Sequence, residues 1–159
     1  MQLNFSNIKV QPLQIANNDI SQDHIEFCKL VEGLKHVDLP ADYLKFIEEF
    51  GEGVIGNYLK IYPVRKLMEY TKPWRECNPT KAEEIFFKKH NRADCTLIGE
   101  IDGDTIFYLN NQYYFSTRNF EEKIYILGNT LNDLLLFFKH DNNYGKMDID
   151  KFVPFDSSL

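Results

Sequence analysis

The sequence predicts an α+β domain, with an antiparallel, mainly meander sheet and helices packed on one face. Amphipathic helical stripes occur over residues 39–50 and 130–138. Between them, residues 96–127 form four short apolar segments separated by tight-turn signals. The chain has 159 residues, of which 43% are hydrophobic and 14% aromatic, which is enough to bury one substantial core.

The stretch LPADYLKFIEEFGEG, residues 39–53, carries the clearest helix signal. Pro40 suits the first helical position, because its missing N–H is not needed there. Gly51 follows the last apolar residue, where a C-cap is expected. Large apolar side chains recur at i, i+3, i+4 and i+7, at Tyr43, Phe46, Ile47 and Phe50. This short helix must pack against a sheet or other helices to be stable.

The two ends of the chain are expected to flank the domain. Residues 1–20 are polar and indicate an arm or an edge strand around Pro12. The domain itself spans residues 21–141 and begins with an amphipathic helix after Ser21. The tail, residues 142–159, is apolar enough that we expect it to pack on the domain or on a partner.

The region before the meander is predicted to contain a strand, a short helix and a loop. Residues 58–62 predict a strand, and Pro63 opens a short helix. Residues 71–79 contain Pro73, Trp74 and Pro79 and predict a loop.

A further helix begins at a capping box, in which Thr80 is followed three residues later by Glu83. Ile85 and Phe86 are then expected on its buried side. The following Lys88, Lys89 and His90 suit the negative C-terminal end of a helix dipole.

The meander is predicted from its turns. Asp102-Gly103 is a strong hairpin signal and Asn110-Asn111 is a second one. The expected strands are 96–101, 105–109, 112–116 and 123–127. Because consecutive links are short, an antiparallel order is favoured.

Charge and composition exclude several classes of function. The net charge is −6 and the pI about 5.2, so the surface repels phosphate backbones, and nucleic-acid binding is not expected. Acidity favours a basic partner, although it is also ordinary for solubility. The three scattered cysteines form no CxxC pair and indicate a reduced compartment. Neither a signal peptide nor a long apolar run occurs, so we expect a cytoplasmic protein with no membrane segment.

Several motifs together resemble the SUKH superfamily, the Smi/Knr-type proteins. The opening Leu39-Pro40-x-x-Tyr43-x-x-Phe46 is followed by Gly51-Glu52-Gly53, and the apolar–aromatic pair Ile61-Tyr62 ends the next strand. The hairpin Leu97-Ile98-Gly99-Glu100-Ile101-Asp102-Gly103-Asp104 and the Leu- and Phe-rich helix 130–138 complete the pattern. The resemblance covers roughly residues 20–140. The first 20 residues and the tail have no counterpart in it.

The resemblance implies a function. Most bacterial members are immunity proteins that bind and neutralise a toxin, often a nuclease, without a catalytic centre of their own. Fungal members act as interaction scaffolds in cell-wall regulation. For this chain the resemblance therefore predicts a non-enzymatic immunity protein that occludes a cognate, basic toxin. The alternatives are a scaffold or regulatory domain without a toxin, and an enzyme with a deep pocket of titratable groups.

The partner-binding candidates are acidic and aromatic. A basic nuclease cleft would be complemented by carboxylates, and rings often anchor interfaces. The main candidates are Glu48, Glu49, Glu52, Asp102, Asp104, Trp74 and Tyr58. Next come Glu121 and Glu122 for charge, and Tyr62, Tyr113 and Tyr114 for rings expected to be half-exposed. The plain alternative is that these carboxylates are solvated turns, and that Trp74 closes the edge of the core.

Neither a metal nor a cofactor is predicted. His24 and Cys28 stand at i and i+4, but no second pair has ligand spacing. No nucleophile elbow, P-loop, dinucleotide fingerprint or HExxH motif occurs, so no catalytic residue is expected. The oligomeric state does not follow from the sequence.

Overall fold

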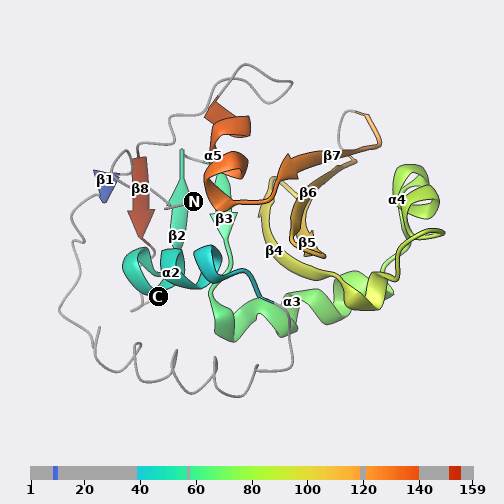
Figure 1. Cartoon of the computed structure of the whole chain (residues 1–159), viewed down its shortest axis with the longest axis horizontal. Coiled ribbons are helices and arrows are strands. Elements are labelled where there is room, and N and C mark those ends of the chain that lie inside the picture. The colour runs from blue at the N-terminus through green and yellow to red at the C-terminus, as the bar shows by residue number, and fades with distance from the viewer. Residues whose placement is uncertain (1–8, 11–38, 57, 119–120, 140–150, 155–159) are drawn as a thin grey trace.

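The computed structural model of the chain describes residues 9–10, 39–56, 58–118, 121–139 and 151–154 (Figure 1). Its elements, in chain order, are β1 (Lys9–Val10), α2 (Ala41–Phe50), β2 (Gly53–Ile55), β3 (Leu59–Ile61), α3 (Val64–Glu76), α4 (Lys81–Phe86), a 3₁₀ turn (Arg92–Asp94), β4 (Thr96–Ile101), β5 (Asp104–Leu109), β6 (Gln112–Thr117), β7 (Lys123–Gly128), α5 (Leu131–Lys139) and β8 (Lys151–Pro154).

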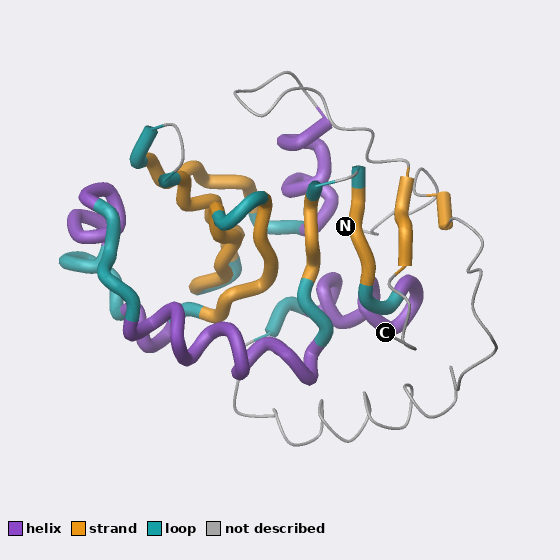
Figure 2. Tube along the Cα trace, turned by 180° about the vertical axis from the view of Figure 1, so that it is seen from behind, coloured by secondary structure: helices purple, strands orange, loops and turns teal. Residues whose placement is uncertain are grey.

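All described strands join one sheet in the order β1-β8-β2-β3-β4-β5-β6-β7. Every neighbouring pair is antiparallel except β1 with β8, which is parallel. The run from β4 to β7 is a meander, and in Figures 1 and 2 it curves away from the upright strands β8, β2 and β3. The predicted α+β class with an antiparallel meander is thereby confirmed.

The predicted hairpin turns are present. Asp102 and Gly103 join β4 to β5 with φ values of 47° and 88°. Asn110 and Asn111 join β5 to β6 with φ values of 48° and 64°. Two consecutive positive φ values match the right-handed twist of the flanking strands, and Asp, Asn and Gly tolerate them best.

Helices cover both faces of the sheet, whereas the sequence predicted them on one. Phe107 pairs with Tyr114, and the Phe86 ring lies 5.0 Å from that of Tyr114 on the α4 side. Phe115, one residue further along β6, points to the opposite face, where the Phe138 ring of α5 lies 5.1 Å away. Both faces of the meander are rich in apolar side chains, so both require cover.

The helix α2 packs on the same face as α5. Tyr43, Phe46 and Ile47 are its buried residues, and the ring of Phe46 meets that of Phe152 in β8 at 5.9 Å. Pro40 precedes the helix in an extended conformation instead of forming its first turn. Gly51 takes a φ of 75°, and its N–H donates to the Ile47 carbonyl at 2.8 Å, which ends the helix as expected.

The helix α3 runs through the segment that was predicted as a loop, residues 71–79. Its buried positions Val64, Leu67, Thr71 and Trp74 continue at helical spacing as far as the last turn. Thr71 also accepts the N–H of Leu97 at 3.0 Å, which ties the helix to β4. Pro73 faces solvent in that last turn. Burial of Trp74 therefore outweighs the backbone hydrogen bond that the proline removes.

The sheet contains two strands, β2 and β8, that the sequence did not predict. The strand β2 was not predicted, because it begins at Gly53 and is followed by Gly56, and glycines so close together are typical of a turn. In the C-terminal tail, β8 lies between β1 and β2 and places Phe152 in the core. At the N-terminal end, β1 forms an edge of the sheet, and the helix expected over residues 21–36 lies outside the described residues.

The helix α4 begins at the predicted capping box. Thr80 and Glu83 exchange hydrogen bonds of 3.2 and 2.9 Å between side chains and backbone N–H groups. The prediction that Ile85 is buried is wrong, since it is 65% exposed. In so short a helix Glu83 turns inward to its cap, which rotates Ile85 outward. Among the described helices none has the length and apolarity to span a membrane.

Candidate functional site

The C-terminal turn of α2 presents two carboxylates to solvent. Glu48 and Glu49 are both exposed, and no basic residue lies in that turn. The negative end of the helix dipole lies there as well, so acidic side chains are locally unfavourable by about 0.3–1 kcal/mol each. Two exposed carboxylates therefore lie at the end of the helix where cations are favoured, with the exposed Lys45 one turn earlier.

Glu52, one turn further along the chain, is engaged differently. Its carboxylate pairs with the Lys66 ammonium of α3 at 2.7 Å, and the Glu52 side chain is only 16% exposed. This pair joins the α2–β2 link to the start of α3. Of the three predicted carboxylates in this region, Glu52 thus has a structural role, and the other two face solvent.

Tyr58 and Asp102 lie next to each other at the end of β3 and β4 that is farther from Glu52. Leu59 of β3 pairs with Ile101 of β4, Tyr58 directly precedes Leu59, and Asp102 directly follows Ile101. Tyr58 is 53% exposed and Asp102 is exposed. Strands of three residues span roughly 10 Å, so this pair and the carboxylates of α2 form two separate surface patches.

Trp74 is not available to a partner, contrary to the expectation of a half-exposed ring. It is 5% exposed and lies 5.3 Å from the Phe107 ring, with the Arg92 guanidinium 4.8 Å above it. The three tyrosines that were expected to be half-exposed are also buried: Tyr62, Tyr113 and Tyr114. Tyr113 and Tyr114 lie on β6, which is covered on both faces, and the pattern of a single strand does not reveal this.

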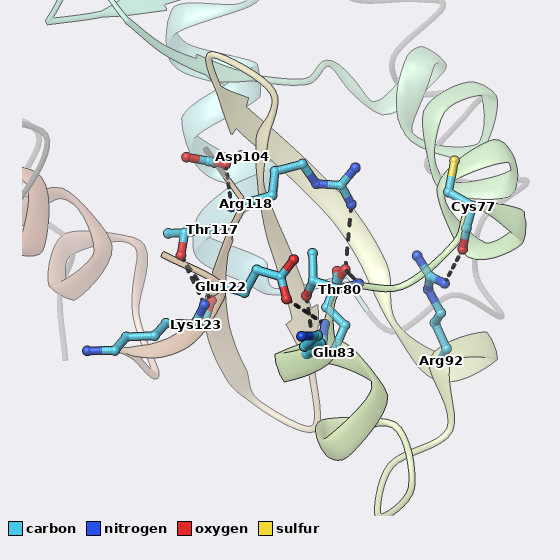
Figure 3. A network of polar contacts seen from close by, with 10 residues as sticks. Cys77, Thr80, Glu83, Arg92, Asp104, Thr117, Arg118, Glu122 and Lys123 are labelled. Atoms are coloured by element: carbon cyan, nitrogen blue, oxygen red, sulfur yellow. Dashed lines mark hydrogen bonds and ion pairs between the residues drawn. The ribbon is translucent and has the colours of Figure 1, made fainter. Parts of the chain in front are cut away.

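Asp104 is also buried, so its predicted place on a partner surface is wrong. Its carboxylate accepts the backbone N–H of Arg118 at 2.8 Å, at the end of β6 (Figure 3). The Arg118 guanidinium reaches the buried Glu83 carboxylate at 3.5 Å. Asp104 therefore positions the residue that joins the meander to α4.

The polar cluster beneath α3 and α4 is incompletely hydrogen-bonded within the described residues. Buried atoms without a partner there are Nε1 of Trp74, Oε2 of Glu83, and Nε and Nη2 of Arg92. Arg92 does donate to the Cys77 carbonyl at 2.8 Å (Figure 3). Burial lowers the pKa of Arg92, and the nearby Glu83 carboxylate opposes that shift.

The two carboxylates of the loop before β7 have local roles. Glu122 accepts the backbone N–H of Lys81 at 2.9 Å, at the start of α4. Glu121 pairs with Lys123 at 3.2 Å, with both side chains exposed. Because each is engaged within the chain, they are weaker partner candidates than Glu48 and Glu49.

An apolar pocket of about 400 Å³ lies between α4 and the start of β7, and the sequence did not predict it. Its lining residues are Ala82, Ile85, Phe86, Lys89, His90, Glu122, Lys123 and Ile124. The pocket is bordered by a helix of only six residues, which leaves Ile85 exposed.

The described part of the chain contains no cluster of side chains that could bind a metal ion. There, no three His, Cys, Asp or Glu side chains lie close enough to hold an ion. The pair His24 and Cys28 lies outside that part.

Comparisons of the chain with family models, curated proteins and solved structures found no significant match.

Proposed function

We propose that this protein is a non-enzymatic immunity protein that acts in the cytoplasm and neutralises a basic cognate toxin, such as a nuclease, by stoichiometric occlusion. The proposal rests on the resemblance to SUKH proteins together with one observation. Glu48 and Glu49 stand exposed at the negative end of α2, the helix that carries the first motif of the resemblance.

That observation supports a binding role because it breaks a rule of helix stability. A helix gains stability from cations at its C-terminus and loses it from anions. Local features that lower stability without a structural return are typical of functional sites. Neither Glu48 nor Glu49 makes a described ion pair, so a basic cleft would be the group that compensates them.

Electrostatic complementarity would also let this protein bind a basic toxin quickly and selectively. A partner with a basic active cleft is steered toward an acidic patch, which raises the association rate at low salt. The second patch, formed by Tyr58 and Asp102, offers an exposed ring with a carboxylate beside it. A ring of this kind suits the anchor of an interface.

The primary test is a survival assay. The C-terminal domain encoded by the adjacent reading frame is expressed under tight control, with and without this protein. We expect cells to die without it and to survive with it, and the two proteins to co-purify one to one. A harmless neighbour, or killing despite co-expression, would contradict the proposal and favour a scaffold domain.

Charge reversal then tests the α2 patch itself. We expect the pair Glu48→Lys and Glu49→Lys to slow association at least tenfold at low salt and to stabilise the fold slightly, by up to about 1 kcal/mol. The matched control is Glu69→Lys with Asp94→Lys, which makes the same change in net charge at exposed positions elsewhere. Equal loss of binding in both pairs would remove α2 from the interface.

A further inference from the structure

The strand β7 forms one edge of the sheet. It is last in the strand order, and within the described residues no strand pairs with its outer side. Natural edge strands are usually protected by charges, bulges or proline. Here Lys123 and a register shift near Gly128 lie at the two ends of the strand. The central residues Ile124, Tyr125 and Ile126 carry neither charge nor proline.

An isoleucine projects from the centre of this edge. Ile126 is 62% exposed, and it pairs with Tyr114, so it lies on the α4 side of the sheet. Ile124 pairs with Ser116 and faces the same side. Exposed Ile85 of α4 adds to the apolar surface here. Contiguous exposed apolar side chains of this kind typically mark an interaction surface.

A depression in the surface lies near the exposed Ile126. The apolar pocket of about 400 Å³ is lined by Ile124, the residue two positions before Ile126, and by α4. Projection and pocket are therefore on the same strand and the same face. The pocket rim carries Lys89 and Lys123 against the single acid Glu122, so it is not acidic although the chain has a net charge of −6.

These features are self-complementary. If two copies of β7 pair in antiparallel fashion with Tyr125 opposite itself, Ile126 of each copy falls opposite Ile124 of the other. A two-fold axis perpendicular to the sheet keeps both α4 pockets on one side. Ile126 of each copy then lies at the pocket of its partner, and cross-strand pairs of β-branched residues are favourable.

We propose that the protein forms a homodimer through its β7 strands, in which Ile126 of each copy enters the open α4–β7 pocket of the other. A second copy suits this surface because the exposed Ile126 and the pocket-lining Ile124 are two residues apart on β7. The two-fold axis therefore places Ile126 of one copy opposite Ile124 of the other. The rim carries two lysines and one glutamate, so the contact does not bring two acidic surfaces together. This dimer is independent of the proposed toxin binding at α2.

The first test is the mass of the full chain in solution. Sedimentation equilibrium at micromolar to submillimolar concentrations should give a mass approaching twice 18.8 kDa. Ile126→Lys should raise the dimer dissociation constant at least a hundredfold without changing the circular dichroism spectrum, because the side chain is exposed. The control Val153→Lys alters an exposed β-branched residue of β8 and should leave the dimer intact.

A crosslink tests the register. In a background with Cys28 and Cys77 replaced by serine, Tyr125→Cys should form an intermolecular disulfide on mild oxidation, because the two copies of this position face each other. Lys123→Cys should not, since the same register separates its two copies by roughly 13 Å along the strands. A monomer at every concentration, a dimer that Ile126→Lys leaves intact, or equal crosslinking at both positions would overturn the proposal.

Discussion

The helices α2 and α5 cover one face of the sheet with aromatic rings and a single shared carboxylate, whereas α3 and α4 cover the other with rings, a buried glutamate and an arginine. On the first face Asp42 accepts hydrogen bonds from the Tyr113 hydroxyl at 2.8 Å and from the backbone N–H of Leu131. On the second, Glu83 and Arg92 keep buried atoms without described partners.

The difference separates two ways of holding a helix on a sheet. The α2–α5 face is stabilised mainly by apolar burial, and its one carboxylate satisfies two donors at once. The α3–α4 face depends on charged groups whose burial costs free energy unless each is fully paired. We therefore expect the first face to be sensitive to loss of volume and the second to loss of charge.

The largest effect is expected from Phe138→Ala on the α2–α5 face. The ring is fully buried and packs against Phe115 and Phe137 at 5.1 Å from each. The cavity should lower the free energy of unfolding by about 3–5 kcal/mol in urea titrations. Ile85→Ala, at an exposed position, is the control and should change it by less than about 0.5 kcal/mol. Similar losses in both variants would mean that the face is not held by packing.

Alkaline pH should be the next most effective perturbation, again of the α2–α5 face. Burial raises the pKa of Tyr43, and burial with the adjacent Asp42 carboxylate raises that of Tyr113, both above the ordinary value of about 10. Above pH 10 the unfolded chain releases these protons while the folded chain retains them, so stability falls as pH rises.

Above pH 10 each of the two tyrosines contributes a decline of about 1.4 kcal/mol per pH unit. Cys95, Tyr62 and Tyr114, whose pKa values are also raised by burial, add to the total. Urea titrations between pH 9 and pH 11 measure it, and Tyr113→Phe should reduce the slope by that amount. A flat profile would show that the two phenols are accessible.

On the α3–α4 face, Glu83→Ala should lower the free energy of unfolding by about 2–3 kcal/mol. It removes half of the capping box and leaves Arg118 without its carboxylate partner. The neighbouring Glu84→Ala is exposed and should have little effect. If both substitutions were neutral, the buried charge would have no structural role.

The smallest effect, about 1–2 kcal/mol, is expected from Asp42→Ala. The change leaves the Tyr113 hydroxyl and the first N–H of α5 without their acceptor. Asp42→Asn retains an acceptor oxygen and should recover part of the loss. Chemical denaturation of the three proteins compares them, and an alanine variant as stable as the wild type would show that the carboxylate is not a tie between α2 and α5.

Much of the fold was predictable from local signals. The stripe of α2, the Asp102-Gly103 and Asn110-Asn111 turns, and the capping box at Thr80 each depend on neighbouring residues alone. The course of α3 was not, because Pro73 is a local breaker and the burial of Trp74 is a tertiary effect. The strand β2 also could not be predicted from its own residues, and it is defined by its pairing with β3 and β8.

The candidate site was predicted in part. Glu48, Glu49, Tyr58 and Asp102 are exposed as a binding role requires, whereas Trp74 and Asp104 are buried. An aspartate after a hairpin glycine resembles a solvated turn residue, and nothing nearby in sequence indicates Arg118, 14 positions away, as its hydrogen-bond partner. The α4–β7 pocket combines two segments about 40 positions apart, which no local pattern brings together.

The place of β8 has a consequence for how the protein is made. Its partner β2 lies roughly a hundred positions earlier in the chain, whereas each strand of the meander pairs with one only a few residues away. Contacts between distant positions form slowly. During synthesis β2 cannot pair with β8, nor Phe46 pack on Phe152, until residues 151–154 have emerged, so the nascent chain carries an open strand edge until then.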